Sequence, residues 1–381
     1  MRQPSNEAGP DVGGEVVLPP MHIAIITAAL GAGGAERVVS LMSGAWAAKG
    51  HRVTIITFDE EGAPIFHPLD PRVELQRLGI TRGGGAVAVA RTFLQRCRIL
   101  RRTLDALRPD VTISFLTKIN VLTLIANLGR DRCVVISERN NPRLQRANRL
   151  WTFTLAWLHW RADAIVMQTK ASLECLGKEA RRRAVVVPNP ITIGLPAQRE
   201  RTYRILAATG RLTWQKGFDL LLDAFARIAD RHPGWRLMIW GEGEGRADLE
   251  RQVRERNLSE RVSLPGNSGS PDEWVEQADA FVLSSRYEGF SNALGEAMAA
   301  GLPVAAFDCR YSPADLIRHG EDGLLVADGD VTALAETLDR LLGDAALRNR
   351  LGRAARMTAE RYRPEAVLAQ WERVLADATG R

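Results

Sequence analysis

Short apolar runs alternate with helix-patterned segments along almost the whole chain, and this alternation constrains the fold most strongly. In the first half, apolar runs predict strands at residues 22–26, 52–58, 111–115, 133–137, 162–168 and 184–190. Helical patterns lie between them, as at 86–107 and from about residue 143. Strands and helices that alternate in this way favour a parallel, doubly wound α/β sheet.

A second series of the same kind begins at residues 203–210, after a segment at 188–201 that contains three prolines. A chain of 381 residues is long enough for two domains, each with its own core. We therefore expect domains at 21–190 and 203–360, and a helix at 361–381. Residues 1–20 are polar and rich in Gly and Pro, so we expect a disordered extension, or upstream sequence if translation begins at Met21.

Charge and cysteine content narrow the class of protein. The formal net charge is +6, which favours nucleic acid, an anionic membrane surface or phosphorylated substrates as partners. The four cysteines (Cys97, Cys133, Cys175 and Cys309) are scattered without metal-ligand spacing, as expected of reduced thiols in a cytosolic protein. No apolar run is long enough to span a bilayer, and the first residues lack the apolar core of a signal peptide.

Residues 284–303 (SSRYEGFSNALGEAMAAGLP) form the most informative stretch. Glu288 follows a predicted strand, and Glu296 lies on a predicted helix from about 292 to 300. In an open α/β sheet, ligands bind at the carboxyl ends of the strands. The free amides of Gly289, Phe290, Ser291 and Asn292 would form a helix N-terminus, which suits a phosphate. Two glutamates at this spacing are common by chance, so a surface glutamate on a loop and another on a helix is the alternative.

Two more turns of the second half carry candidate ligand-binding groups. Arg211 and Lys216 share one strand-to-helix turn, where two cations suit a diphosphate, although basic turns are also common on surfaces. Gly241 and Gly243 follow the apolar run at 235–240, where a plain glycine turn is one explanation.

The glycine-rich turn of the first half is another candidate. Gly31, Gly33 and Gly34 lie between a predicted strand and helix, where backbone can approach a ligand closely. A dinucleotide-binding fingerprint would need its third glycine where Glu36 stands, so that match fails. A tight strand-to-helix connection without any ligand is the alternative.

The loop at residues 137–142 (SERNNP) also follows a predicted strand. Glu138 and Arg139 are therefore candidates for a ligand-binding site. Alternatively, one of the two braces the loop through a salt bridge.

Taken together, these motifs resemble the retaining nucleotide-sugar glycosyltransferases of family 4, which have the GT-B fold. GGAERVV, SERNNP and WQKGFD look most like bacterial exopolysaccharide and lipid-linked-oligosaccharide transferases of the amylovoran-biosynthesis type. The resemblance implies two Rossmann-like domains facing a cleft, and a C-terminal helix that crosses back to the first domain. It also implies that Glu288 contacts the donor sugar, Glu296 the ribose, and Arg211 with Lys216 the diphosphate. The loop with Gly241 and Gly243 would lie on the nucleotide side.

The same resemblance implies the reaction. A hexosyl group would move with retention from a nucleotide-diphosphate sugar, with uridine as the expected base, to a saccharide acceptor. Gly33 and Gly34 would close over the reaction centre. With two cations and a helix N-terminus available, no metal ion or other cofactor is expected, and no Asp-x-Asp pair stands at a comparable edge. The family often has a histidine near the acceptor hydroxyl, and this chain has none in the matching loop, so the roles of Glu138 and Arg139 stay open.

Two basic segments, residues 91–108 and 142–161, carry arginines, and the second also has Trp151, Phe153, Trp157 and Trp160. They are either helices with a core face and solvated arginines, or a surface that binds anionic lipid headgroups. The second alternative favours a polyprenyl-diphosphate-linked acceptor and a cytoplasmic protein on the inner face of the membrane. No nucleic-acid-binding motif accompanies the arginines. Two other functions stay open: a sugar-nucleotide epimerase with the same fold, and an inactive nucleotide-sugar-binding protein.

Overall fold

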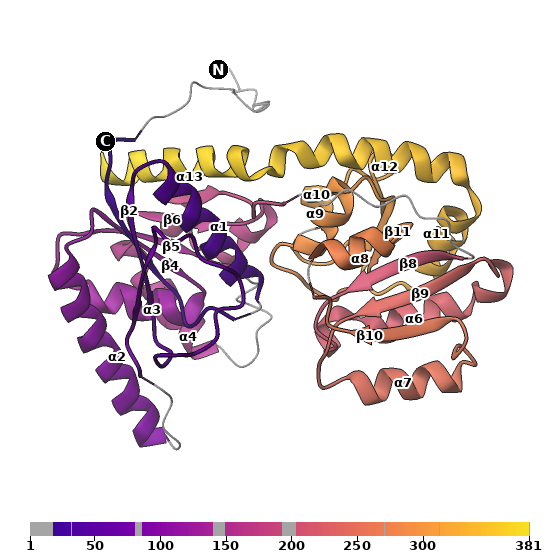
Figure 1. The fold of residues 1–381 in the computed structure, drawn as a ribbon, viewed down its shortest axis with the longest axis horizontal. Helices are drawn as coiled ribbons and strands as arrows, with labels where there is room; N and C mark the ends of the chain where they lie inside the picture. The colour runs from indigo at the N-terminus through magenta and orange to yellow at the C-terminus, as the bar shows by residue number, and fades with distance from the viewer. Residues whose placement is uncertain are drawn as a thin grey trace.

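The computed structural model describes residues 18–31, 33–80, 86–139, 149–192, 203–269, 271–311 and 313–380. Four expected features lie wholly or partly outside the described residues. They are residues 1–17 of the N-terminal extension, most of the interdomain segment, the start of the helix from about residue 143 and half of the SERNNP loop. The described residues form two α/β domains side by side (Figure 1).

The first domain contains a parallel sheet of seven strands in the order β3-β2-β1-β4-β5-β6-β7. In chain order the strands are β1 His22–Ile26, β2 Arg52–Thr57, β3 Glu74–Arg77, β4 Val111–Phe115, β5 Cys133–Ser137, β6 Ala164–Met167 and β7 Ala184–Val186. Its helices are α1 Gly34–Ala48, α2 Ala86–Leu107, α3 Thr117–Ala126, α4 Arg149–Leu158 and α5 Lys178–Arg182, with short 3-10 turns η2 His159–Arg161 and η3 Ala171–Cys175.

Side-chain alternation explains why helices cover both faces of this sheet. On β1, Ile23 and Ile25 point into a core shared with α1, whereas Ala24 and Ile26 point into a core shared with α2 and α3. The strand is apolar on both faces and fully buried. In Figure 1, α1 lies above the sheet, and α2, α3 and α4 lie below it.

The second domain has a parallel sheet of six strands in the order β10-β9-β8-β11-β12-β13. Its strands are β8 Arg204–Thr209, β9 Trp235–Trp240, β10 Val262–Gly266, β11 Ala280–Leu283, β12 Val304–Phe307 and β13 Leu324–Val326. Its helices are α6 Phe218–Ala226, α7 Arg246–Glu255, α8 Pro271–Gln277, α9 Asn292–Ala299, α10 Pro313–Leu316, α11 Val331–Gly343 and α12 Ala345–Ala359, with 3-10 turns η4 Trp214–Lys216, η5 Ala229–Arg231 and η6 Glu360–Tyr362.

The chain ends in α13 Pro364–Thr379, which runs back along the first domain (Figure 1). Val367, Leu368, Trp371 and Leu375 are buried in the core between β1 and α1. The Trp371 ring stands edge-on to Trp46, with 6.2 Å between centroids. The predicted fold class is confirmed: two Rossmann-like domains, with a last helix that crosses back.

Candidate active site

The turn between β8 and α6 carries the two predicted cations, Arg211 and Lys216. Gly217 ends this turn with φ +62°, and a Cβ there would lie 2.0 Å from the Ser284 carbonyl oxygen. Only glycine therefore lets the turn approach the end of β11 so closely. As a result, Lys216 Nζ lies 2.6 Å from Glu288 Oε1 across the gap between the two loops.

Glu288 is buried at the carboxyl end of β11, at 5% exposure. Ser285 Oγ donates to the same carboxylate oxygen at 2.6 Å, and the Glu288 amide donates to the Arg310 carbonyl at 2.9 Å. One carboxylate oxygen thus has a cation and a hydroxyl as partners. The sequence predicted Lys216 at the diphosphate and Glu288 at the sugar, and the structure places the two side chains in contact with each other.

Helix α9 begins directly after this loop. Ser291 caps it by accepting a hydrogen bond from the Leu294 amide, and Glu296 follows one turn later. Glu296 pairs with Arg37 of α1, 259 residues earlier in the chain. The second terminal nitrogen of Arg37 donates to Thr192 Oγ1 at 3.1 Å. The predicted ribose-binding glutamate is therefore held by an arginine of the other domain.

The glycine turn of the first domain also faces the start of α9. A Cβ on Gly34 would lie 2.6 Å from the side-chain nitrogen Nδ2 of Asn292. Asn292 Oδ1 in turn accepts a hydrogen bond from Asn189 Nδ2 at 2.6 Å. Gly33 and Gly34 thus line the same cavity as the start of α9.

Glu138 and Arg139 are neighbours in sequence, but their side chains occupy different buried environments. Glu138 accepts hydrogen bonds from Thr117 at 2.8 Å and from Asn120 at 2.6 Å. Arg139 lies over the rings of Phe115 and Trp371, with its guanidinium carbon 4.7 and 5.6 Å from their centroids. Within the described residues neither side chain makes an ion pair, so the salt-bridge alternative is not seen there.

Burial shifts the pKa of both groups in the direction that favours the uncharged form. Desolvation raises the pKa of Glu138, and the hydrogen bonds from Thr117 and Asn120 lower it by less, so that the pKa is about 7. Desolvation also lowers the pKa of Arg139 to about 9, so this side chain stays charged at neutral pH. Its Nη1 donates to Asn189 Oδ1, while Nε and Nη2 have no hydrogen-bond partner among the described residues.

Most of the predicted residues line one cavity between the domains, with a volume of about 1640 Å³. This volume exceeds the roughly 300–1,000 Å³ of ordinary ligand pockets and leaves room for two substrates. The predicted residues along its wall are Gly33, Gly34, Arg139, Arg211, Lys216, Gly241, Glu288, Gly289, Phe290, Ser291, Asn292 and Glu296.

Two predicted residues do not line the cavity. Glu138 lies behind Thr117, which does line it. Gly243 packs against the turn instead, since a Cβ there would lie 2.5 Å from the Leu212 carbonyl oxygen. Its absent side chain lets the loop after β9 lie flat on the Arg211 turn, so Gly243 shapes the site without facing it.

Arg37 and Asn189 belong to the site, although neither was predicted from sequence. Arg37 stands one turn after the glycines, and Asn189 lies between two prolines after β7. Both positions follow strands whose carboxyl ends face the cleft. This placement is the feature of the sequence from which they could have been predicted as site residues. Their partners, Glu296 and Asn292, are distant in sequence, and only the tertiary structure shows the contacts.

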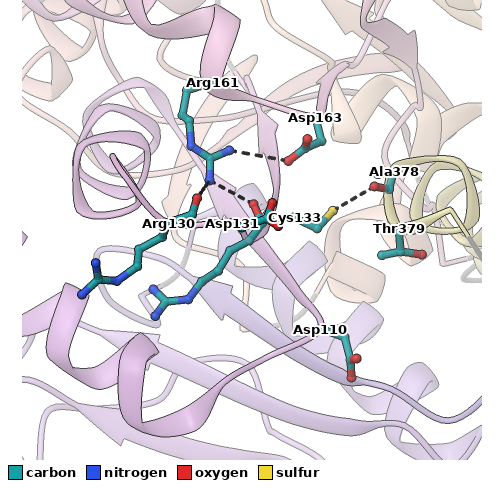
Figure 2. Close-up of a pocket in the computed structure, with 9 residues that line it drawn as sticks. Asp110, Arg130, Asp131, Cys133, Arg161, Asp163, Ala378 and Thr379 are labelled. Carbon is teal, nitrogen blue, oxygen red and sulfur yellow. Dashed lines mark hydrogen bonds and ion pairs between the residues drawn. The ribbon is translucent and has the colours of Figure 1, made fainter.

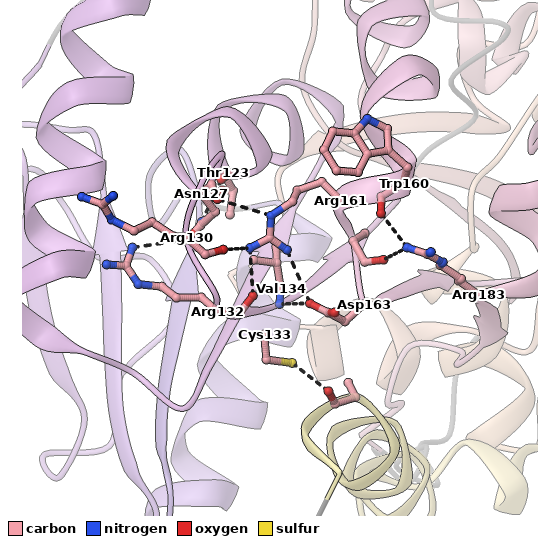
Figure 3. Close-up of polar contacts among 12 residues, drawn as sticks. Thr123, Asn127, Arg130, Arg132, Cys133, Val134, Trp160, Arg161, Asp163 and Arg183 are labelled. Atoms are coloured by element: carbon pink, nitrogen blue, oxygen red, sulfur yellow. Dashed lines mark hydrogen bonds and ion pairs between the residues drawn. The ribbon is translucent and has the colours of Figure 1, made fainter.

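A smaller cavity of about 320 Å³ lies at the opposite edge of the first sheet (Figure 2). There Asp110 and Asp163 precede β4 and β6 and accept hydrogen bonds from the amides of His22 and Val134, both at 2.7 Å. Arg161 donates to the carbonyls of Asn127, Arg130 and Arg132 (Figure 3). These charged groups fix strand starts and loops, and ligands of open α/β sheets bind at the other edge.

Metal ligands are not clustered in the described part of the chain: no group of three or more His, Cys, Asp or Glu side chains is placed to hold a metal ion there. The helices described are also too short or too polar to cross a membrane.

Two family models match consecutive parts of the chain. The model described as Glycosyltransferase Family 4 matches residues 32–194, and the model described as Glycosyl transferases group 1 matches residues 196–358. The first matched range covers the first domain with Gly33 and Gly34. The second covers the second domain with Arg211, Lys216, Glu288 and Glu296.

Among curated relatives, an exopolysaccharide phosphotransferase of Streptomyces coelicolor is 34% identical over 74% of this chain and 30% of its own length. The amylovoran biosynthesis glycosyltransferase AmsD of Erwinia amylovora is 34% identical over 45% of this chain and 48% of its own length. The chain thus spans less than half of either relative. An N-acetyl-D-galactosaminyltransferase of Campylobacter jejuni, named for a diphospho-undecaprenol-linked substrate, is 26% identical over 94% of this chain and 99% of its own.

Solved structures share the fold at lower identity. Sucrose-phosphate synthase from Thermosynechococcus elongatus has a TM-score of 0.80 at 20% identity, covering 93% of this chain and 98% of its own. Anabaena HepE, solved with UDP-glucose, has a TM-score of 0.75 at 17% identity, covering 93% of this chain and 99% of its own. With its family 4 domain followed by a group 1 domain, this chain belongs to the glycosyltransferases of the GT-B fold.

Proposed function

We propose that this protein transfers a sugar, with retention, from a nucleotide-diphosphate sugar to a lipid-linked saccharide in bacterial exopolysaccharide or glycan biosynthesis. One observation carries the proposal. Arg211 and Lys216 come from one loop, Glu288 and the N-terminus of α9 come from another, and the two loops meet along one cleft wall. These groups fit a diphosphate and a sugar bound side by side, with Glu296 further along α9 for the ribose.

The chemistry follows from the charges on that wall. As the bond between the sugar and the diphosphate breaks, negative charge grows on the departing phosphate. Arg211, Lys216 and the amides at the start of α9 stabilise that charge more in the transition state than in the ground state. This arrangement supplies the stabilisation without a metal ion. Lys216 already contacts Glu288. When a donor is bound, the positive charge of Lys216 would therefore be shared between the Glu288 carboxylate and the phosphate.

The acceptor would bind against the first domain. The Gly33–Gly34 turn and Arg139 line that side of the cavity, opposite the donor wall. A lipid-linked saccharide is favoured because the Campylobacter relative, which aligns over nearly its whole length, is named for such a substrate. Uridine diphosphate is the favoured nucleotide because HepE, a neighbour in fold, was solved with UDP-glucose.

A panel of nucleoside diphosphates and nucleotide sugars, scored by thermal shift and by sugar transfer, tests this proposal. A ligand that binds only the folded state raises the melting temperature, and we expect this for a uridine diphosphate donor. Arg211→Ala and Lys216→Ala should each lower turnover by about a hundredfold, the effect of losing one charge-stabilising donor. The anomeric configuration of the product, followed by NMR, should match that of the donor.

The matched control is Arg251→Ala, which removes a solvent-exposed arginine from α7 of the same domain and should leave turnover unchanged. Near-normal turnover in both cleft variants would refute the diphosphate clamp. Donor conversion without any added acceptor would indicate an epimerase, and nucleotide binding without chemistry would indicate an inactive binding protein.

A further inference from the structure

The outer face of α4 and η2 exposes four large apolar side chains. Leu150, Phe153, Trp157 and Trp160 are 74%, 74%, 68% and 60% exposed, and together they are called the α4 surface here. Their spacing of three, four and three residues puts them on one side of a helix. Leu155 and Leu158 on the opposite side are buried in the core. Water-soluble surfaces rarely carry so much contiguous apolar area without a partner.

Positive charge surrounds the α4 surface. On α2, which lies on the same side of the sheet as α4 (Figure 1), the outward residues Arg91, Arg98 and Arg102 are exposed. Segment 86–104, which contains most of α2, has five arginines and no Asp or Glu. Helix α5, which packs against η2, adds the exposed basic residues Lys178, Arg181 and Arg182, of which Arg182 pairs with the exposed Glu179 of the same helix. An apolar face among cations matches an anionic amphiphile in charge as well as in polarity.

The α4 surface is also continuous with the acceptor side of the cleft. Trp151, next to Leu150, turns inward and contacts Phe93 of α2, with 5.2 Å between ring centroids. Trp151, Phe93 and Val89 all line the large cavity. An apolar path thus leads from the exposed face into the cleft.

We propose that the α4 surface binds the interface of an anionic lipid bilayer and holds the mouth of the cleft at the membrane. Aromatic side chains are favoured at the boundary between headgroups and acyl chains, and arginines attract anionic headgroups. A lipid-linked acceptor could then keep its chain in the bilayer while its saccharide enters the cleft. That last consequence depends on the proposed function, whereas binding to the bilayer does not.

A second copy of this chain is a less suitable partner for the α4 surface. In a symmetric dimer the same patch meets itself, so the arginines of α2 and α5 would face one another. Like charges held at close range oppose such an association. An anionic bilayer has the opposite charge.

Flotation of the full-length chain with vesicles tests the proposal. We expect binding to vesicles of phosphatidylcholine mixed with phosphatidylglycerol, weaker binding to phosphatidylcholine alone, and weakening by salt. The double variant Trp157→Ser, Trp160→Ser should partition at least about tenfold more weakly, since burying an aromatic side chain is strongly favourable. The matched control is Met357→Ser on α12, which removes an equally exposed apolar side chain (74% exposed) from the other domain and should bind as the parent does.

Two readouts separate this inference from the proposed function. The double variant should keep the parent's thermal shift with uridine diphosphate, because the α4 surface belongs to the first domain, whereas Arg211 and Glu288 belong to the second. Flotation without any nucleotide binding would leave the membrane surface standing and refute the transferase. Nucleotide binding without flotation, or equal flotation of the double variant, would refute the membrane surface alone. A parent dimer that becomes a monomer in the double variant, without vesicle binding, would assign the surface to self-association instead.

Discussion

Glu138 and Arg139 show how a strand end separates adjacent side chains. They follow β5, where successive residues point to opposite faces of the sheet. Glu138 therefore meets Thr117 and Asn120 on one face, and Arg139 meets Trp371 of the last helix on the other. Opposite charges next to each other in sequence are thus buried apart. Within the described part of the chain, each has polar or aromatic neighbours and no counter-ion.

The raised pKa of Glu138 makes the stability of the first domain depend on pH. Its folded-state pKa is about 7 and its ordinary value 4.5, so its contribution is fully present below about pH 4.5 and is lost as the pH rises through about 7. Glu138→Gln keeps the shape and cannot ionise. Relative to this variant, the parent should lose a few kcal/mol of unfolding free energy between pH 5 and pH 8.

Urea unfolding at the two pH values, followed by a probe in the first domain, measures this loss. The matched control is Glu260→Gln, at an exposed turn before β10, which should unfold in parallel with the parent at both pH values. A Glu138→Gln variant whose difference from the parent stays constant with pH would contradict the buried, proton-binding carboxyl.

At the scale of elements, two loops of the second domain are locked together near the site. Arg286, two residues before Glu288, stacks on Trp214 of η4 at 4.7 Å and pairs with Asp219 of α6 at 2.6 Å. Gly217 makes this contact possible, since its φ of +62° and missing side chain let the turn meet the Ser284 carbonyl. The distance between Lys216 and Glu288 is therefore set by backbone packing between elements.

Gly217→Ala should damage both stability and turnover. The new Cβ meets the Ser284 carbonyl oxygen at 2.0 Å, so the turn must move, and Lys216 with it. We expect a loss of about 1–3 kcal/mol from overpacking, added to about 1–2 kcal/mol of left-handed backbone strain. Thermal unfolding and sugar transfer measure the two effects.

Gly329→Ala isolates the strain, because Gly329 has φ +74° and nothing within 4 Å of its added Cβ. This variant should lose only the strain and should keep its turnover. Equal losses in the two variants would mean that the contact with Ser284 does not position the turn.

The sequence predicted those elements and site residues whose signal is local. Strands such as HIAII and AFVL are buried on both faces, so their apolar runs are continuous. Strand β3 (ELQR) was missed because it lies at the edge of the sheet with no fully buried residue. Arg211, Lys216 and Glu288, which line the cavity, could be predicted as candidates because each lies in a short polar turn after an apolar run. The ion pair between Arg37 and Glu296 could not be predicted from sequence, since it depends on how the two domains pack.

At the scale of the whole molecule, helix α13 packs into the core of the first domain. Helix α13 follows the second domain in sequence, yet its buried residues belong to the core of the first. Trp371 is fully buried there between Trp46 and Phe115, and it also covers Arg139. The two domains are therefore joined by two crossings, one after β7 and one before α13.

Trp371→Ala should consequently loosen the first domain and spare the second. Removing a buried tryptophan costs about 3–5 kcal/mol, because the surrounding core does not fully close the cavity. Amide hydrogen exchange resolves the effect by element: protection should fall in β1, β4 and β5 and stay unchanged in β8, β9 and β11. Phe225→Ala, which empties an equally buried site in the second core, should give the reverse pattern. Similar loss of protection in both sheets after Trp371→Ala would mean that the molecule unfolds as one unit, with α13 coupling the domains instead of belonging to the first.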